Sequence, residues 1–524
     1  MRAFLFFLLM SFTGYVSAQP NIILIMTDDM GYSDLGCYGG EIKTPHLDKL
    51  AEEGLRFTQF YNTGRCCPTR ASLMSGLYPH QAGMGHMTKD EGEEHPGYRG
   101  RLMERAVTIA EVLGENGYET IQTGKWHLGN EKPSWPAARG FKKSFSCPQG
   151  AGFFFKLKDF EVTRKTRTVT RNDEAVYTRE NDMPDGWYAT DAWTDEGLGF
   201  VKEAVKNEKP FFWYLAYNAP HWPLLAKQED IAKYKGVYDK GWDEVRKQRY
   251  ERLKKMGLIK EEWAMSPRPD KIPAWDSLSE DEQVKQANRM AIYAAMIDCV
   301  DQNIGKIVTS LKALGQYENT LILFLQDNGG CAEGGVLGSD TGTGKRETGQ
   351  SGSFIKYGVC WANVSNTPFR MYKKWAHEGG AGTPLVAHWP KGINRKLHGE
   401  LIHEPAHVID IMATCVEITG SEYPKRFNDH NILPIQGVSL NPLFQDKGFS
   451  RNAPLFWEHE GNRAVRDGKW KLVMPYNGDW ELYDMDKDRT ELNDLSSQMP
   501  EKKKMLEKHY QEWADSSMVE PRKR

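Results

Sequence analysis

Short apolar runs alternate with stretches of helical periodicity along most of this chain, and this alternation is the strongest constraint on its fold. The runs are rich in Ile, Leu, Val and aromatic residues and are bounded by Gly, Pro and polar clusters, which is typical of buried strands. Strands are predicted at residues 21–26, 120–123, 210–217, 320–325 and 384–388. Helices are predicted at residues 44–53, 108–116, 194–206, 280–314 and 407–419. The order predicts an α/β fold with a large, mostly parallel sheet flanked by helices.

The pattern changes near residue 453, where shorter alternating runs begin. They lie at 462–465, 470–475 and 480–484 and precede a terminal segment rich in Lys and Glu. We therefore predict a large domain over residues 19–452 and a small antiparallel α+β domain with a terminal helix over 453–524. Within the larger domain, the charged stretch 227–273 is predicted as a surface insertion and the Gly-rich stretch 334–353 as a loop.

Residues 1–18 have the pattern of a signal peptide. Arg2 precedes a short apolar run, and Val16, Ser17 and Ala18 are small residues of the kind that signal peptidase recognises, so cleavage is predicted after Ala18. The run is too short to span a bilayer, because a spanning helix needs about 20 apolar residues. The mature protein is therefore expected in the periplasm or outside the cell, without a membrane span.

Charge and cysteine content exclude several function classes. The 68 Lys and Arg residues nearly balance the 71 Asp and Glu residues, which leaves a net charge of −3 and no basic field for nucleic acid or an anionic membrane. Eight cysteines in 524 residues are too few for a disulfide scaffold. One or two bridges, or a reactive thiol, remain open.

Acidic residues follow two of the predicted strands. Asp28 and Asp29 follow the first strand, and Asp327 and Asn328 follow the fourth. Ligands of open α/β sheets bind beyond the carboxyl ends of the strands, so these side chains are expected to converge. Carboxylate and amide oxygens suit Ca²⁺ or Mg²⁺ and suit Zn²⁺ poorly. Either motif alone is also compatible with a turn or a helix cap.

Basic side chains follow two further strands. Lys125 and His127 come after the strand at 120–123, and His221 comes after the strand at 210–217. Residues two apart in an extended segment face the same side, so Lys125 and His127 are predicted to face the acidic crevice together. A histidine beside a tryptophan is also compatible with simple packing.

The segment Cys66-Cys67-Pro68-Thr69-Arg70 begins another short predicted helix. Pro68 is predicted at the first helical position and Gly76 beyond the last turn, which places Cys66 just ahead of the helix. A helix N-terminus with an arginine is suited to bind an anion. These features leave Cys66 open as a thiolate nucleophile, a disulfide partner or a buried thiol.

The run Cys66-x-Pro68-Thr69-Arg70 resembles the signature of type I sulfatases, the formylglycine-dependent, arylsulfatase-like members of the alkaline-phosphatase superfamily. The resemblance extends in family order over about residues 20–495. It includes Asp28-Asp29, Lys125-Trp126-His127-Leu128-Gly129, Pro220-His221-Trp222-Pro223, Asp327-Asn328-Gly329, and Lys373 ahead of Glu378-Gly379-Gly380. Gln326 stands where Ser often occurs in the family, and Thr69 replaces the commoner Ser.

This resemblance implies a sulfuric ester hydrolase that acts on a sulfated carbohydrate, or on an aryl sulfate in an assay. It also implies that a maturation enzyme converts Cys66 to formylglycine. The cation, Ca²⁺ or alternatively Mg²⁺, would contact residue 66 and be held by Asp28, Asp29, Asp327 and Asn328.

The resemblance further implies a role for each basic residue. One hydroxyl of the hydrated aldehyde would attack sulfur, with Arg70 and Lys125 stabilising it as an alkoxide. Lys125 and Lys373 would bind the sulfuryl oxygens as charge grows. His221 would protonate the leaving alcohol, and His127 would deprotonate the second hydroxyl to release sulfate.

Two other functions remain open at this point. A phosphate- or phosphonate-ester hydrolase of the same superfamily shares the fold and the acidic strand ends. A degenerate glycan-binding protein is the non-enzymatic alternative, and it is disfavoured because every expected catalytic position is filled.

Overall fold

The computed structural model describes residues 19–150, 154–156, 168–178, 182–341 and 348–521. The predicted signal peptide at residues 1–18 lies outside the described residues.

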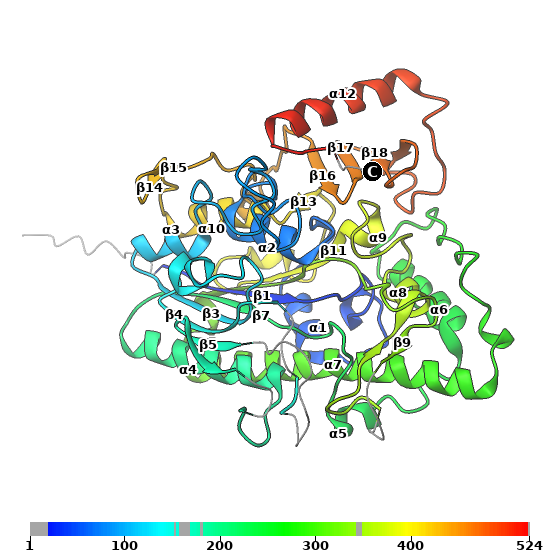
Figure 1. Ribbon diagram of the computed structural model, residues 1–524, viewed down its shortest axis with the longest axis horizontal. Helices are drawn as coiled ribbons and strands as arrows, with labels where there is room; N and C mark the ends of the chain where they lie inside the picture. The colour runs from blue at the N-terminus through cyan, green and yellow to red at the C-terminus, as the bar shows by residue number, and fades with distance from the viewer. Residues whose placement is uncertain (1–18, 151–153, 157–167, 179–181, 342–347, 522–524) are drawn as a thin grey trace, which may run out of the picture.

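A large mixed sheet lies at the centre of the molecule (Figure 1). In spatial order its strands are β12 (Leu401–Ile402), β2 (Leu55–Tyr61), β11 (Gly382–His388), β8 (Thr320–Gln326), β1 (Asn21–Thr27), β7 (Phe211–Ala216), β3 (Glu119–Lys125), β4 (Lys143–Cys147), β5 (Val169–Arg171) and β6 (Glu174–Tyr177). β13 (Ala406–His407) also pairs with β2. Strand β1 is parallel to β7 and β8, and β3 is parallel to β7 and β4. These pairs confirm the predicted, mostly parallel sheet.

Strand β2 is the main element that sequence analysis did not predict. It pairs antiparallel with β11, which is also antiparallel to β8. The polar residues Arg56, Thr58 and Gln59 interrupt the apolar pattern of β2, so the sequence does not indicate a strand there. Their side chains donate hydrogen bonds to backbone carbonyls of the adjacent segment at residues 399–403.

Helices cover both faces of the sheet (Figure 1). One layer contains α1 (Pro45–Glu52), α4 (Ala189–Lys206) and α7 (Glu280–Ala313), and the other contains α2 (Cys66–Ser75), α3 (Ile109–Glu115) and α10 (Asp410–Thr419). Alternate side chains of β1 pack into the two layers: Ile23 and Ile25 into the first, and Ile22, Leu24 and Met26 into the second. Burial of both faces of β1 explains its continuous apolar run.

Some element ends differ from the sequence prediction. Helix α4 begins at Ala189 rather than at 194, and α10 begins at Asp410 because residues 406–407 form strand β13 instead. Residues 227–273 contain α5 (Gln228–Ala232) and α6 (Gly241–Lys255) and no strand, as predicted. The insertion is not only a surface feature, however, because Trp242 and Trp263 are buried in the larger core.

The C-terminal part forms a separate four-stranded antiparallel sheet, which confirms the predicted small C-terminal domain. Its strands are β16 (Leu455–His459), β17 (Asn462–Asp467), β18 (Trp470–Met474) and β19 (Glu481–Asp484), and α12 (Pro500–Ser516) packs against β17 and β18. The remaining elements are β9 (Ser339–Asp340), β10 (Ile355–Lys356), β14 (Arg426–Phe427), β15 (His430–Asn431), α8 (Gly358–Ser365), α9 (Glu378–Ala381) and α11 (Asn441–Phe444). Strand β9 lies within the loop predicted at 334–353 and pairs with β10 just beyond it, and residues 342–347 of that loop lie outside the described residues.

All eight cysteines are buried, and no disulfide joins any of them in the described part of the chain, so none of the bridges that the composition left open is formed there. Within the described ranges, no helix is both long and apolar enough to cross a bilayer.

Candidate active site

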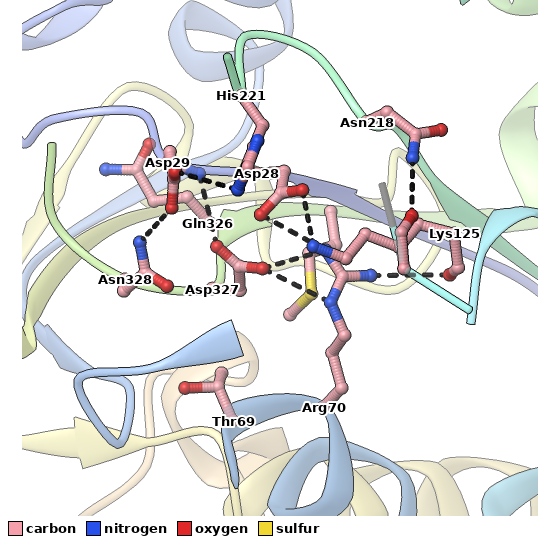
Figure 2. Close-up of polar contacts among 12 residues, drawn as sticks. Asp28, Asp29, Thr69, Arg70, Lys125, Asn218, His221, Gln326, Asp327 and Asn328 are labelled. Carbon is pink, nitrogen blue, oxygen red and sulfur yellow. Dashed lines mark hydrogen bonds and ion pairs between the residues drawn. The ribbon is translucent and has the colours of Figure 1, made fainter. Parts of the chain in front are cut away.

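The acidic residues that follow β1 and β8 meet beyond the carboxyl ends of these neighbouring parallel strands (Figure 2). The backbone N–H of Asp29 donates to Asp327 Oδ1 at 3.3 Å, and Asn328 Nδ2 donates to Asp29 Oδ1 at 2.7 Å. Asp28, on the same turn, donates its backbone N–H to the Ala219 carbonyl at 3.1 Å. These side chains are at most 1% exposed. The structure thus brings together all four residues that the sequence predicted to converge.

Two lysines from distant segments neutralise the turn after β1. Lys125 Nζ lies 2.6 Å from Asp28 Oδ2, and Lys373 Nζ lies 2.6 Å from Asp29 Oδ1. Both ammonium groups are buried. Lys374, next in the chain, instead reaches Glu460 at 3.3 Å and is about half exposed, which supports Lys373 as the site residue.

Arg70 enters the same cluster from helix α2, on the other side (Figure 2). Its Nη2 lies 2.8 Å from Asp327 Oδ2, and its Nη1 donates to the Tyr214 hydroxyl at 3.2 Å and to the Lys125 carbonyl at 3.4 Å. The guanidinium is fully buried, so solvent screens its charge much less than that of an exposed group.

The carboxyl groups of Asp28 and Asp327 differ in their pKa. Burial alone would raise the pKa of Asp28, but Lys125, His221 and Arg70 outweigh burial and hold that pKa below its usual range. Burial, and then the charge of Asp28, raise the pKa of Asp327 well above its usual range. A further positive charge at this point would let both carboxylates ionise together.

The oxygen atoms of this cluster fit a hard divalent cation. Asp28 Oδ1 and Asn328 Oδ1 are buried and accept no hydrogen bond from any described residue. One ligand atom each of Asp28, Asp29 and His221 lies within 4.8 Å of the others. An all-oxygen set of carboxylates and an amide is what Ca²⁺ and Mg²⁺ prefer. Asp28, Asp29, Asp327 and Asn328 are therefore the residues that could hold the ion.

Cys66 is the first residue of α2, which corrects the predicted start of this helix. Arg65 is the N-cap, Pro68 is in the third helical position, and Gly76 ends the helix in the left-handed conformation at φ 70°. Pro68 is tolerated there because the first turn of a helix needs no N–H donor. The Cys66 thiol therefore lies at the positive end of the helix rather than in the loop before it.

The thiol of Cys66 faces His127. The ligand atoms of Cys66, Cys67 and His127 lie within 4.8 Å of one another. A hydrogen bond from Cys67 is the main factor that lowers the pKa of Cys66 well below its usual range; burial opposes this effect, and the charge of Lys125 adds to it. Cys66 forms no disulfide, so that alternative is excluded. Its side chain lies among polar groups.

His127 reaches this position by a different path from the predicted one. Strand β3 ends at Lys125, and His127 is in the left-handed conformation at φ 61°, so the segment is not extended. Its backbone N–H donates to the Pro148 carbonyl at 3.0 Å, which fixes the turn. Burial, and then the charge of Lys125, lower the pKa of His127 to about 4, so the ring is neutral at pH 7.

His221 lies on the opposite side of the acidic cluster from Arg70 (Figure 2). Its Nε2 lies 3.4 Å from Asp29 Oδ2, and its Nδ1 lies 2.5 Å from the Trp222 carbonyl oxygen. His127 and His221 are therefore placed at separate points of the site.

Some residues at the site were not singled out from the sequence. Tyr214 bonds Arg70, and Asn218 donates to the Gly150 carbonyl at 2.8 Å and accepts from Trp193, which holds the loop after β7. Arg65 and Glu333 form an ion pair at 3.3 Å. Tyr214 lies within an apolar strand pattern, which gives no sign of a polar role. Arg65 is a charged residue directly before Cys66, and this position is a signal that the sequence does carry.

Comparison with known proteins agrees with this geometry. A family model described as "Sulfatase" matches residues 20–421, more than half of the chain. The chain belongs to the sulfatase family. A second model, "N-sulphoglucosamine sulphohydrolase, C-terminal", matches residues 369–516 of this sulfatase.

Curated relatives cover most of the chain. An arylsulfatase of Klebsiella aerogenes is 37% identical over 448 residues, which is 83% of this chain and 94% of the relative. An uncharacterized sulfatase of Schizosaccharomyces pombe is 34% identical over 520 residues, 93% of this chain and 91% of the relative. Human arylsulfatase A is 28% identical and covers 87% of this chain and 75% of its own length. The protein is a sulfuric ester hydrolase.

Solved structures share the fold. Ps i-CgsB, in complex with k-i-k-neocarrahexaose, aligns with a TM-score of 0.69 at 27% identity, covering 96% of this chain and 94% of the other. A phosphonate monoester hydrolase of Agrobacterium radiobacter aligns with a TM-score of 0.58 at 18% identity, covering 95% and 96%, which shows a common fold alone. Both agree with an alkaline-phosphatase-like architecture.

Proposed function

We propose that this sulfatase is exported and removes sulfate from a sulfated carbohydrate, with aryl sulfates as assay substrates. The solved complex of Ps i-CgsB with k-i-k-neocarrahexaose, at 27% identity over nearly the whole chain, supports a sugar as substrate. The predicted signal peptide supports export, and sequencing the N-terminus of the mature protein is expected to find Gln19 first.

The proposal depends above all on one observation. Cys66 is the first residue of a buried helix, and its Sγ lies within 4.8 Å of a ring nitrogen of His127, beside Lys125 and the acidic cluster. A maturation enzyme would convert Cys66 to formylglycine, whose hydrate supplies a hydroxyl nucleophile. Lys125 and Arg70 lie where their charges stabilise an alkoxide at residue 66. His127, neutral at pH 7, is the group that can accept a proton from that side chain.

The opposite side of the site is assigned to the sulfate ester and its leaving group. A divalent cation held by Asp28, Asp29, Asp327 and Asn328 would supply positive charge to a sulfate oxygen. Lys373 and Lys125 now pair with these carboxylates, and they are the ammonium groups that can turn to the remaining sulfuryl oxygens. His221 lies across the cluster from Arg70 and, as the imidazolium ion, would donate its Nε2 proton to the leaving alcohol, which leaves a neutral ring with its proton on Nδ1.

The test compares sulfate and phosphate esters of the same phenol on matured enzyme. Mass spectrometry of the peptide containing residue 66 first establishes formylglycine, and free sulfate and free phosphate are then measured in parallel. Sulfate release is expected to dominate. Dominant phosphate release, or full turnover with an unmodified cysteine at position 66, would contradict the proposal.

The cation site has a separate test in protein stability. Removing divalent ions with a chelator is expected to lower the melting temperature, because an ion at about 100 times its Kd stabilises the folded state by about 2.7 kcal/mol. Adding Ca²⁺ should restore the melting temperature in the wild type, and the variant Asp28→Asn should respond much less. An equal response of both proteins would place the ion elsewhere, and a larger effect of Mg²⁺ would identify Mg²⁺ as the resident ion.

A further inference from the structure

A chain of polar contacts links the N-terminus of the nucleophile helix to the segment that carries His221. Arg65, the N-cap of α2, donates from Nη1 to Glu333 Oε1 at 3.3 Å. The other oxygen of this carboxylate, Oε2, accepts the indole N–H of Trp222 at 3.0 Å. Glu333 thus bridges two residues, each of which is the direct neighbour in sequence of a proposed catalytic residue.

Trp222 contacts His221 through both its backbone and its ring. A carbonyl oxygen can only accept, so the 2.5 Å contact between His221 Nδ1 and the Trp222 carbonyl requires a proton on Nδ1. Nε2, the atom that faces Asp29, is then the nitrogen left to face the substrate. The imidazole and indole rings also pack together, with centroids 5.0 Å apart and planes inclined by 34°. The orientation of the indole therefore constrains the direction of the His221 Nε2–H bond.

The indole is in turn held at other points. Lys356 Nζ lies 3.7 Å from the ring centroid, and Phe354 meets the ring edge-on at 5.4 Å. These contacts restrict the ring plane, but an aromatic ring can still slide in its plane. The hydrogen bond to Glu333 is directional and fixes that remaining movement.

We propose that Glu333 is a positioning residue for the leaving-group side of the reaction: through the Trp222 indole it holds His221 in the orientation that delivers a proton to the departing oxygen. The inference rests on the proposed role of His221. It assigns to Glu333 no contact with substrate and no proton transfer of its own.

The expected signature is in the dependence of the rate on the leaving group. A good leaving phenol departs without a proton, whereas a poor one needs the acid, so misplacing the acid slows poor leaving groups most. We therefore expect Glu333→Ala and Trp222→Phe to steepen the plot of log kcat/KM against the pKa of the leaving phenol. General acids contribute about 10²–10⁴-fold, and partial misplacement should cost about tenfold more for phenols of pKa about 10 than for those of pKa about 7.

Two comparisons separate this signature from general damage. Glu333 is 36% exposed, so Glu333→Ala is expected to fold with an unchanged melting temperature. The double variant Glu333→Ala/Trp222→Phe should be no steeper than either single variant, because both remove the same hydrogen bond. Glu203→Gln, which breaks a surface ion pair with Lys143, is the control and should leave the plot unchanged.

His221→Ala distinguishes failure of this inference from failure of the proposed function. If His221→Ala steepens the plot and Glu333→Ala lowers the rate equally for every phenol, Glu333 does not position the acid. If His221→Ala itself leaves the slope unchanged, the general-acid assignment is wrong, and the positioning role is overturned with it. Steeper plots for all three variants support the inference.

Discussion

Replacing Cys66 by serine is expected to abolish multiple-turnover sulfate release, with a loss on the order of 10³-fold or more, as for other enzymes that lose their nucleophile. The physical reason is that serine offers one hydroxyl, whereas the hydrated aldehyde offers two. Serine at position 66 can attack sulfur once, but His127 then finds no second hydroxyl to deprotonate. The measurement is free sulfate over many turnovers, together with the intact mass of the protein.

The neighbouring thiol provides a matched control for this variant. Cys67 is buried beside Cys66 and occupies the variable position of the motif. Cys67→Ala should keep turnover within about tenfold of wild type, because the hydrogen bond that it removes acts on the Cys66 thiol, which the conversion to formylglycine replaces. Undiminished turnover by Cys66→Ser, or an equal loss in both variants, would refute the special role of Cys66.

The second large effect is expected in stability, at a buried ion network between the C-terminal sheet and the catalytic part. Lys471 Nζ, on β18, lies 2.8 Å from Glu378 Oε1 and 2.9 Å from Glu491 Oε1, and Arg489 Nε lies 2.7 Å from Glu378 Oε2. All of these side chains are fully buried. Glu378 starts helix α9, shortly after Lys373 in the chain.

Lys471→Met is expected to lower the free energy of unfolding by about 3–5 kcal/mol, because it leaves two buried carboxylates with too little positive charge. Chemical denaturation at neutral pH measures this change. Lys49→Met is the control: Lys49 forms ion pairs with Glu52 and Glu53 on the surface, where such pairs contribute about 0–1 kcal/mol. Similar losses in the two variants would contradict a structural role of the buried network.

The pH dependence of this difference gives an independent check. Burial alone would raise the pKa of Glu378, but Lys471 and Arg489 lower it from 4.5 to about 2. A carboxyl whose pKa is lower in the folded state stabilises the protein above its unfolded pKa, and that contribution is lost as the pH falls through the folded value. The stability gap between wild type and Lys471→Met should therefore narrow between about pH 4.5 and pH 2. A gap that widens on acidification would reverse the assigned sign.

The sequence by itself determined the parallel core of the fold and which acidic strand ends meet beside it. Strands such as β1 and β8 carry continuous apolar runs because both faces are buried, and a pattern of that kind is visible without coordinates. Asp28, Asp29, Asp327 and Asn328 could be grouped because parallel strands bring their carboxyl ends to one edge. The motif around Cys66 then predicted which of the eight cysteines is converted to formylglycine.

Only the tertiary structure decided which groups contact one another. The left-handed turn at His127, the start of α2 at Cys66 and the burial of β2 depend on long-range packing, which overrides local pattern. The pairing of Lys125 with Asp28, and of Glu333 with Trp222, joins residues 97 and 111 positions apart in the chain. Hydrogen bonds and charges act over a few ångströms in space, whatever the distance along the chain, so no sequence spacing could specify them.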